Sequence, residues 1–199
     1  MEKEMNVLVL NMSTFPAKAM HSYRFIDKKS GYTFVCESES QLVPITKLLL
    51  DKVKKEQGGI QKIVIMATED TLKVSNSNEW GEDVSPCSFY LSEVGGKKVS
   101  AAELNQGWEG ERKETELYVG EKKISVALVK IQKPVGMAFY QNVIQTIKGN
   151  GDVQVNLFMD MQGGDRNAIT QANAIVSLLK NQGIKLCGRY AIDFDRTRK

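Results

Sequence analysis

The sequence predicts an α/β protein whose central sheet is mostly parallel, with helices on both faces and additional β-hairpin elements. Three observations predict this fold class. Near-continuous apolar runs at residues 6–11 and 153–159 are typical of strands that are buried on both faces of a parallel sheet. In the last third of the chain, helices and strands alternate with short connections, which indicates parallel crossover units. Aromatic and β-branched residues flank a polar loop at residues 27–31, which is the pattern of a hairpin.

The first third of the chain begins with a buried strand and continues through the hairpin into a long helix. The expected elements are strands at residues 6–11, 22–26, 32–36 and 62–66 and a helix at residues 40–57. Ser40 can cap this helix, and Pro44 falls in its first turn, where proline is tolerated. Gly58 and Gly59 end the helix. This part therefore predicts a strand, a hairpin, a helix and a strand.

The middle of the chain has a weaker pattern. Residues 69–114 are rich in Ser, Asn, Gly, Glu and Lys, so we expect a less regular insertion in which residues 101–104 can start a short helix. Trp80 and Trp108 lie here, and for both a packing role is favoured over stacking on a nucleobase. Two further strands are expected at residues 115–119 and 123–131.

The last third has the clearest pattern. The expected elements are helices at residues 136–148 and from Asp165 or Asn167 to about residue 182, and strands at residues 153–159 and 184–192. Both helices carry an apolar stripe at helical spacing, and glycines follow both of them. The alternation of helix and strand indicates a Rossmann-like sheet with helices on both faces.

Composition places the chain among ordinary soluble globular proteins. Hydrophobic residues make up 42% and charged residues 26% of the 199 residues, and this length favours one domain, residues 1–199. Twenty-seven basic residues stand against 24 acidic ones, which argues against a surface that coats duplex nucleic acid. No apolar signal-peptide core opens the chain, and no run approaches the roughly 20 apolar residues that cross a bilayer. We therefore expect a cytoplasmic protein without a membrane partner.

The sequence indicates neither metal chemistry nor a catalytic constellation. Cys36, Cys87 and Cys187 lie far apart and form no CxxC pair, so we expect a reducing compartment, no metal site and no cofactor. His21 is the only histidine, and no nucleophile or carboxylate is fixed beside it, so a surface or structural role is favoured. Catalytic residues stay unknown at this level.

Two polar loops leave the ends of the most apolar strands. Ligands of open parallel sheets bind beyond the carboxyl ends of the strands, near the point where the strand order reverses. The first loop is Asn11-Met12-Ser13-Thr14-Phe15, and the second runs from Asp160 to Arg166. Both loops offer small hydrogen-bonding groups, and we expect them to form a binding site together.

The second loop suits a ligand that carries phosphate. Gly163 and Gly164 allow backbone N–H groups to approach a ligand, and Arg166 adds a fork of donors at the positive end of the following helix. Asp165 opposes a bare phosphate, but it can accept a hydrogen bond from a ribose hydroxyl or an adenine amino group. The alternative is a tight turn that caps a helix and binds nothing. The loop contains neither GxGxxG nor a P-loop.

The layout of these motifs resembles the CARF family, the CRISPR-associated Rossmann-fold sensor domains. The resemblance is carried by the first strand with its short polar loop, by the aromatic hairpin ahead of a long helix, and by the segment Asp160-Met161-Gln162-Gly163-Gly164-Asp165-Arg166. This segment is similar to the family pattern of an Asp, a glycine and an Arg that open a helix. The resemblance covers most of the chain outside residues 69–114. The first loop has Met12-Ser13-Thr14 where other members have a glycine turn.

The resemblance implies a homodimer that binds cyclic tetra- or hexa-adenylate, a second messenger of antiviral defence, in a cleft on its two-fold axis. An effector activity would then be controlled allosterically, in which case the chain is either the N-terminal part of a longer effector or a stand-alone sensor. Asn11, Ser13 and Thr14 would contact one part of the ring. The phosphates and ribose of another part would contact Gln162, Gly163, Gly164 and Arg166. The full candidate set is Asn11, Met12, Ser13, Thr14, Phe15, Thr68, Asp160, Gln162, Gly163, Gly164, Asp165, Arg166 and Asn167.

Three other functions stay open. The first is an enzyme, a metal-independent ring nuclease that cleaves the same messenger. In such an enzyme an in-line ribose 2′-hydroxyl can attack the phosphate while Arg166 stabilises the charge. A flavodoxin-like or other Rossmann-type protein could bind a different nucleotide. The last alternative is a structural or interaction domain without a ligand.

Overall fold

The computed structural model describes residues 4–15, 19–74, 80–132, 135–149, 153–163, 168–180 and 182–192. Its strands are β1 (Glu4–Asn11), β2 (His21–Ile26), β3 (Thr33–Ser38), β4 (Lys62–Ala67), β5 (Arg112–Val119), β6 (Lys122–Lys130), β7 (Gln154–Asp160) and β8 (Ile184–Tyr190). Its helices are α1 (Leu42–Gln57), α2 (Glu69–Leu72), α3 (Pro86–Gly95), α4 (Ala101–Leu104), α5 (Met137–Lys148) and α6 (Ala168–Leu179).

Within these residues the main sheet has six strands in the order β5-β6-β4-β1-β7-β8. All neighbouring pairs are parallel except β5 and β6, which form an antiparallel pair at one edge. The order reverses at β1, because the chain passes from β1 to β4 on one side and later returns to β7 on the other. The predicted Rossmann-like α/β fold with a mostly parallel sheet is confirmed.

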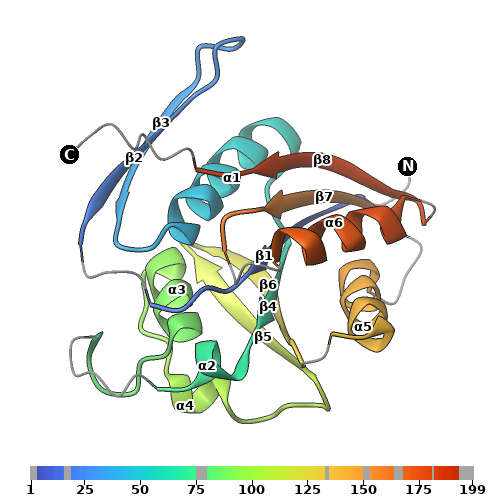
Figure 1. Cartoon of the computed structure of the whole chain (residues 1–199). Coiled ribbons are helices and arrows are strands. Elements are labelled where there is room, and N and C mark those ends of the chain that lie inside the picture. Colours follow the sequence, from blue (N-terminus) through green and yellow to red (C-terminus); the bar gives the residue numbers. More distant parts are fainter. Residues whose placement is uncertain are drawn as a thin grey trace.

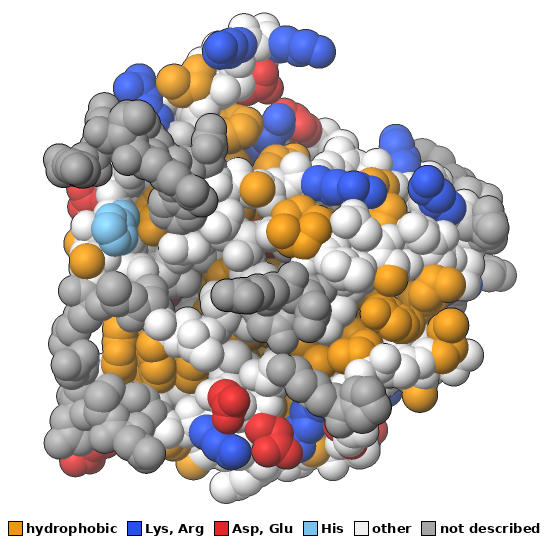
Figure 2. Space-filling model, in the orientation of Figure 1, with side chains coloured by type: hydrophobic (Ala, Val, Ile, Leu, Met, Phe, Trp, Pro, Cys, Tyr) orange, Lys and Arg blue, Asp and Glu red, His pale blue; other side chains and the backbone are white. Residues whose placement is uncertain are grey.

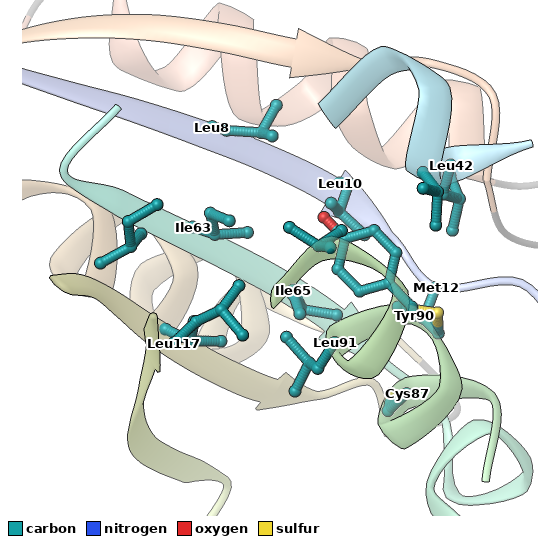
Figure 3. Close-up of a cluster of buried hydrophobic side chains, with 14 of the residues drawn as sticks. Leu8, Leu10, Met12, Leu42, Ile63, Ile65, Cys87, Tyr90, Leu91 and Leu117 are labelled. Carbon is teal, nitrogen blue, oxygen red and sulfur yellow. The ribbon is translucent and has the colours of Figure 1, made fainter. Parts of the chain in front are cut away.

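Helices cover both faces of this sheet (Figure 1). Alternate residues of β1 point to opposite faces, so Leu8 and Leu10 enter the core beneath α1 and α3, while Val7 and Val9 enter the core beneath α5 and α6. The first of these cores is shown in Figure 3, where Tyr90 and Leu91 of α3 face the strand residues. Burial on both faces explains why the central strands read as continuous apolar runs.

The middle of the chain contributes to the core beneath α1. Cys87, Tyr90, Leu91 and Val94 of α3 are buried there. Ser85 caps α3 by accepting a hydrogen bond from the Ser88 N–H, and the Ser88 side chain accepts one from the Ser85 N–H in return. Residues 101–104 form α4, the short helix expected there.

The hairpin of β2 and β3 forms a separate antiparallel two-stranded sheet that projects from the body of the molecule beside α1 (Figure 1). The loop that joins its two strands is held on α1 by polar contacts. The Tyr32 hydroxyl donates to Asp51 over 2.6 Å, and Lys52 forms an ion pair of 3.5 Å with Asp27. The aromatic run that predicted a hairpin therefore supplies the face that packs on α1.

Candidate functional site at the carboxyl edge of the sheet

The two polar loops leave the sheet side by side. β1 and β7 are neighbours, with Leu10 opposite Asp160, and the strand order reverses at this pair. Both loops therefore emerge at the carboxyl edge of the sheet at the switch point, which is where open α/β sheets bind their ligands. The expected proximity of the two loops is present for their described parts, residues 11–15 and 160–163. Gly164, Asp165, Arg166 and Asn167 lie outside the described residues.

Gly163 makes the contact between the two loops. A Cβ atom at this position would lie 1.8 Å from the backbone oxygen of Asn11 and 2.7 Å from Cδ2 of Leu42. No side chain fits in that space, so glycine is required by packing. Gly163 was expected to let the backbone approach a ligand; the close approach in the structure is made to the end of β1, and it fixes the second loop against the first.

A cavity of about 200 Å³ lies beside this contact. Its lining comes from the first loop and from the starts of α1 and α3, and the lining residues are Met12, Ser13, Thr14, Phe15, Ser40, Gln41, Leu42, Pro86 and Phe89. None of these side chains is charged. Hydroxyl and amide groups together with apolar groups give it the mixed lining of a small-molecule site.

The start of α1 gives the cavity an electrostatic preference. Gln41 is the N-cap residue, and its side chain makes no capping hydrogen bond. The Ser40 hydroxyl accepts a hydrogen bond of 3.3 Å from the Leu42 N–H, which is the capping contact expected of this residue. The first turn contains no acidic residue. The positive end of a 16-residue helix therefore faces the cavity without a carboxylate to offset it, which favours an anion.

The second loop reaches the cavity through its hydrogen bond to Gln41. The Gln162 side chain donates to Oε1 of Gln41 over 3.1 Å, and its own Oε1 accepts from the Ile192 N–H over 2.9 Å. Neither Gln162 nor Gly163 lines the cavity. In this conformation the described part of the second loop therefore positions the N-terminus of α1 and the chain after β8.

Asp160 is buried at the end of β7, with 1% of its surface exposed. Its Oδ1 accepts a hydrogen bond of 2.8 Å from the Gln162 N–H, and its Oδ2 has no partner in the part of the chain that the structure describes. Burial raises the pKa of this carboxyl to about 8, against the lowering effect of the Gln162 hydrogen bond. Asp160 is therefore mostly protonated at neutral pH, and it does not line the cavity.

Thr68 lies apart from the first loop. It lines a second hollow of about 490 Å³ at the ends of β4 and β6, together with Glu69, Asp70, Glu111, Lys130, Ile131 and Gln132. Acidic side chains dominate that hollow, so it does not suit a ligand that carries phosphate. The structure thus brings the first loop to the α1 cavity and leaves Thr68 elsewhere on the carboxyl edge.

Aromatic rings border the cavity on the α3 side. The Phe15 ring stacks on Trp80 with centroids 4.9 Å apart, and Trp80 meets Phe89 edge-on at 4.8 Å. Trp108 lies elsewhere: its Nε1 donates to the Leu104 oxygen, and Lys130 lies 4.3 Å from its ring centre. Both tryptophans pack within the chain, in line with the favoured interpretation.

Several cavity residues had no individual signal in the sequence. Gln41, Pro86 and Phe89 line the cavity only because α1 and α3 begin at the same edge as the first loop. Ser85 followed by Pro86 is a helix-start signal that could have located α3. The position of α3 over the sheet, however, depends on tertiary packing.

His21 and the three cysteines are the side chains on which a catalytic or redox role would depend. His21 is exposed on β2, and its ring meets the Tyr23 ring edge-on at 6.3 Å. Cys36, Cys87 and Cys187 are free thiols. Within the described residues no group of three or more His, Cys, Asp or Glu side chains could hold a metal ion.

Basic side chains are scattered over the face in Figure 2 and do not gather in one patch. No helix in the described part of the chain is long and apolar enough to cross a membrane.

The fold and the site together define an α/β protein of Rossmann-like architecture with a polar cavity at its switch point. No family model, no curated protein and no solved structure matches the chain.

Proposed function

We propose that this chain is a CARF-type sensor domain that binds a cyclic oligoadenylate in a cleft shared by two copies of the chain. The observation that carries the proposal is the cavity at the switch point, where the first loop meets an α1 N-terminus that has no acidic residue in its first turn. Phosphate groups bind well to such a helix end. Hydroxyls of Ser13, Thr14 and Ser40 can bond ribose and phosphate oxygens.

The size of the cavity supports a ligand that spans two copies. A volume of about 200 Å³ is below the roughly 300–1,000 Å³ of sites that enclose a drug-sized ligand. One cavity can therefore hold a phosphate and its sugar but not a ring of four or six nucleotides. A ring with even symmetry can place equivalent phosphates in the two cavities of a two-fold dimer.

Isothermal titration calorimetry with cyclic tetra-adenylate and cyclic hexa-adenylate tests this proposal, with adenosine monophosphate and linear oligoadenylate as controls. We expect one ring per two chains and an affinity well above that of the linear compounds. The absence of binding to either ring at high micromolar concentration, for folded protein, overturns the proposal. Chromatography of the ring after several hours with the protein tests cleavage, because linear products would establish a ring nuclease.

Two variants test which residues bind the ring. Arg166→Ala removes a guanidinium expected to contact phosphate and should weaken binding about tenfold or more, because hydrogen bonds to charged groups contribute about 1.5–3 kcal/mol. Thr14→Val removes one hydroxyl from the cavity and should weaken binding up to about tenfold. Arg112→Ala and Thr115→Val on β5 are the matched controls and should leave binding unchanged. Equal effects of site and control variants would contradict the assignment.

A further inference from the structure

The outer face of the β2–β3 hairpin is exposed and partly apolar. Side chains alternate between the two faces, so Tyr23 and Phe25 face inward and are half-buried, whereas Ile26 and Val35 face outward. Ile26 is 52% and Val35 is 58% exposed, and Met20, just ahead of β2, is 63% exposed. These are three of the five large apolar side chains that are more than half exposed among the described residues.

A two-stranded sheet of this kind is stable only when other elements pack against it. An isolated hairpin is marginal in water, and here the half-buried inner face, which includes Phe25, is the one that packs on α1. Ile26 and Val35 are diagonal neighbours, because Val35 lies opposite Arg24 and Ile26 opposite Thr33. Two β-branched side chains at that spacing make the centre of a surface that suits another sheet face.

The charges on the same face are self-complementary. Arg24, which lies directly opposite Val35, and Glu37, two residues further along β3, both point outward beside Val35, and neither forms an ion pair within the described residues. A two-fold axis that passes close to Val35 brings the two Val35 side chains together. The same axis brings Arg24 of each copy to Glu37 of the other. A symmetric dimer therefore contains two ion pairs, each between Arg24 of one copy and Glu37 of the other.

We propose that the outer face of the hairpin binds the same face of a second copy of this chain. The proposal names the dimer surface that the proposed function needs, and it rests on that function for its link to the ligand. The side chains on one hairpin face make a small interface, below about 1,200 Å² in total, which is the size of weak and transient complexes. The free protein is therefore in a concentration-dependent equilibrium between monomer and dimer, and a ring held by both copies shifts it to the dimer.

The chain connects this surface directly to the candidate site. β2 follows the first loop, whose Ser13, Thr14 and Phe15 line the cavity, and β3 leads through Ser40 and Gln41 into α1. The β3 end of the hairpin is thus separated from cavity residue Ser40 by Glu39 alone, whereas five residues of sequence separate Phe15 from β2. A ligand that moves the first loop or the start of α1 changes the orientation of the hairpin, and with it the geometry of the dimer.

Analytical ultracentrifugation of the full chain, from about 1 to about 200 µM, tests the proposal through a charge swap. Arg24→Glu places two carboxylates together at both contacts, and Glu37→Arg places two cations together. Each variant alone should raise the dissociation constant of the dimer about tenfold or more. An equimolar mixture of the two variants should recover the dimer, because each contact then joins an arginine to a glutamate. Lys97→Glu, an exposed charge after α3, is the control and should leave dimerisation unchanged.

A wild-type chain that stays monomeric at every concentration overturns the proposal, and so does a mixture that dimerises no better than the single variants. Because recovery in the mixture requires folded chains, a folding defect cannot imitate it. Calorimetry separates this result from the proposed function. Hairpin dimers that bind no ring refute the function alone, whereas ring binding by chains whose dimers ignore the charge swap refutes the hairpin surface alone.

Discussion

Gly163→Ala tests whether the second loop is held by its contact with the end of β1. The new Cβ would lie 1.8 Å from the Asn11 backbone oxygen, whereas Cβ contacts under 3.0 Å essentially never occur. The loop must therefore move by roughly 1.2 Å or more, away from a backbone that is fixed inside the sheet. Overpacking of this kind typically costs 1–3 kcal/mol, and the rigid carbonyl places this site near the upper end, at about 3 kcal/mol.

Urea and thermal unfolding measure this cost. A loss of about 3 kcal/mol should lower the midpoint temperature by about 6–12 °C for a domain of this size. Gly136→Ala is the control, since a Cβ there meets nothing within 4 Å and the backbone φ of −110° suits any residue. Alanine at that N-cap position should cost at most about 1 kcal/mol. If the two variants are equally stable, the second loop is not held by the Gly163 contact.

Three further predictions concern buried groups. The pKa of Asp160 is about 8 in the folded state, above its unfolded value, so the folded state binds the proton more tightly. The free energy of unfolding should therefore fall as pH rises from about 4 to 8, by up to about 1.4 kcal/mol per pH unit. Asp160→Asn should remove that slope in urea unfolding at pH 5 to 8, and an unchanged slope would contradict the raised pKa. Tyr90→Phe removes the 2.8 Å hydrogen bond to Thr46 and should cost about 1 kcal/mol, whereas Thr46→Val in the Tyr90→Phe background should cost clearly less than it does alone. Cys87 is fully buried and burial raises its pKa to about 12, so mass spectrometry after thiol labelling of native protein should find Cys36 modified well before Cys87.

Local patterns were enough to predict most of the fold. The apolar runs of β1 and β7, the aromatic hairpin and the amphipathic α1 and α5 lie within one or two residues of their expected bounds. In these segments, burial on one or two faces imposes a regular spacing of apolar residues. The same spacing does not reveal α3, because its ten residues mix serine and glycine with apolar residues and give too short a stripe.

The candidate site was only partly predictable for the same physical reason. The two loops were located because strand ends are local features and parallel strands end at one edge. The cavity beside the first loop depends on where the starts of α1 and α3 come to lie, and that is a matter of packing over long sequence separations. Thr68 follows an equally apolar strand, yet it borders a different and acidic hollow, so a polar residue at a strand end was not a sufficient criterion.

The protonation state of Asp160 affects how the site can bind phosphate. As a sequence motif, Asp160 opens the glycine-rich loop and was expected to contact the ligand. In the structure its carboxyl is buried and mostly protonated at neutral pH, so it does not repel a phosphate bound at the α1 N-terminus. Ionisation at higher pH would place an unpaired charge beneath the loop that Gly163 fixes. Phosphate binding should therefore weaken as pH rises through about 8 in the wild type. In Asp160→Asn it should not, and calorimetry at pH 6.5 and 8.5 would measure the difference directly.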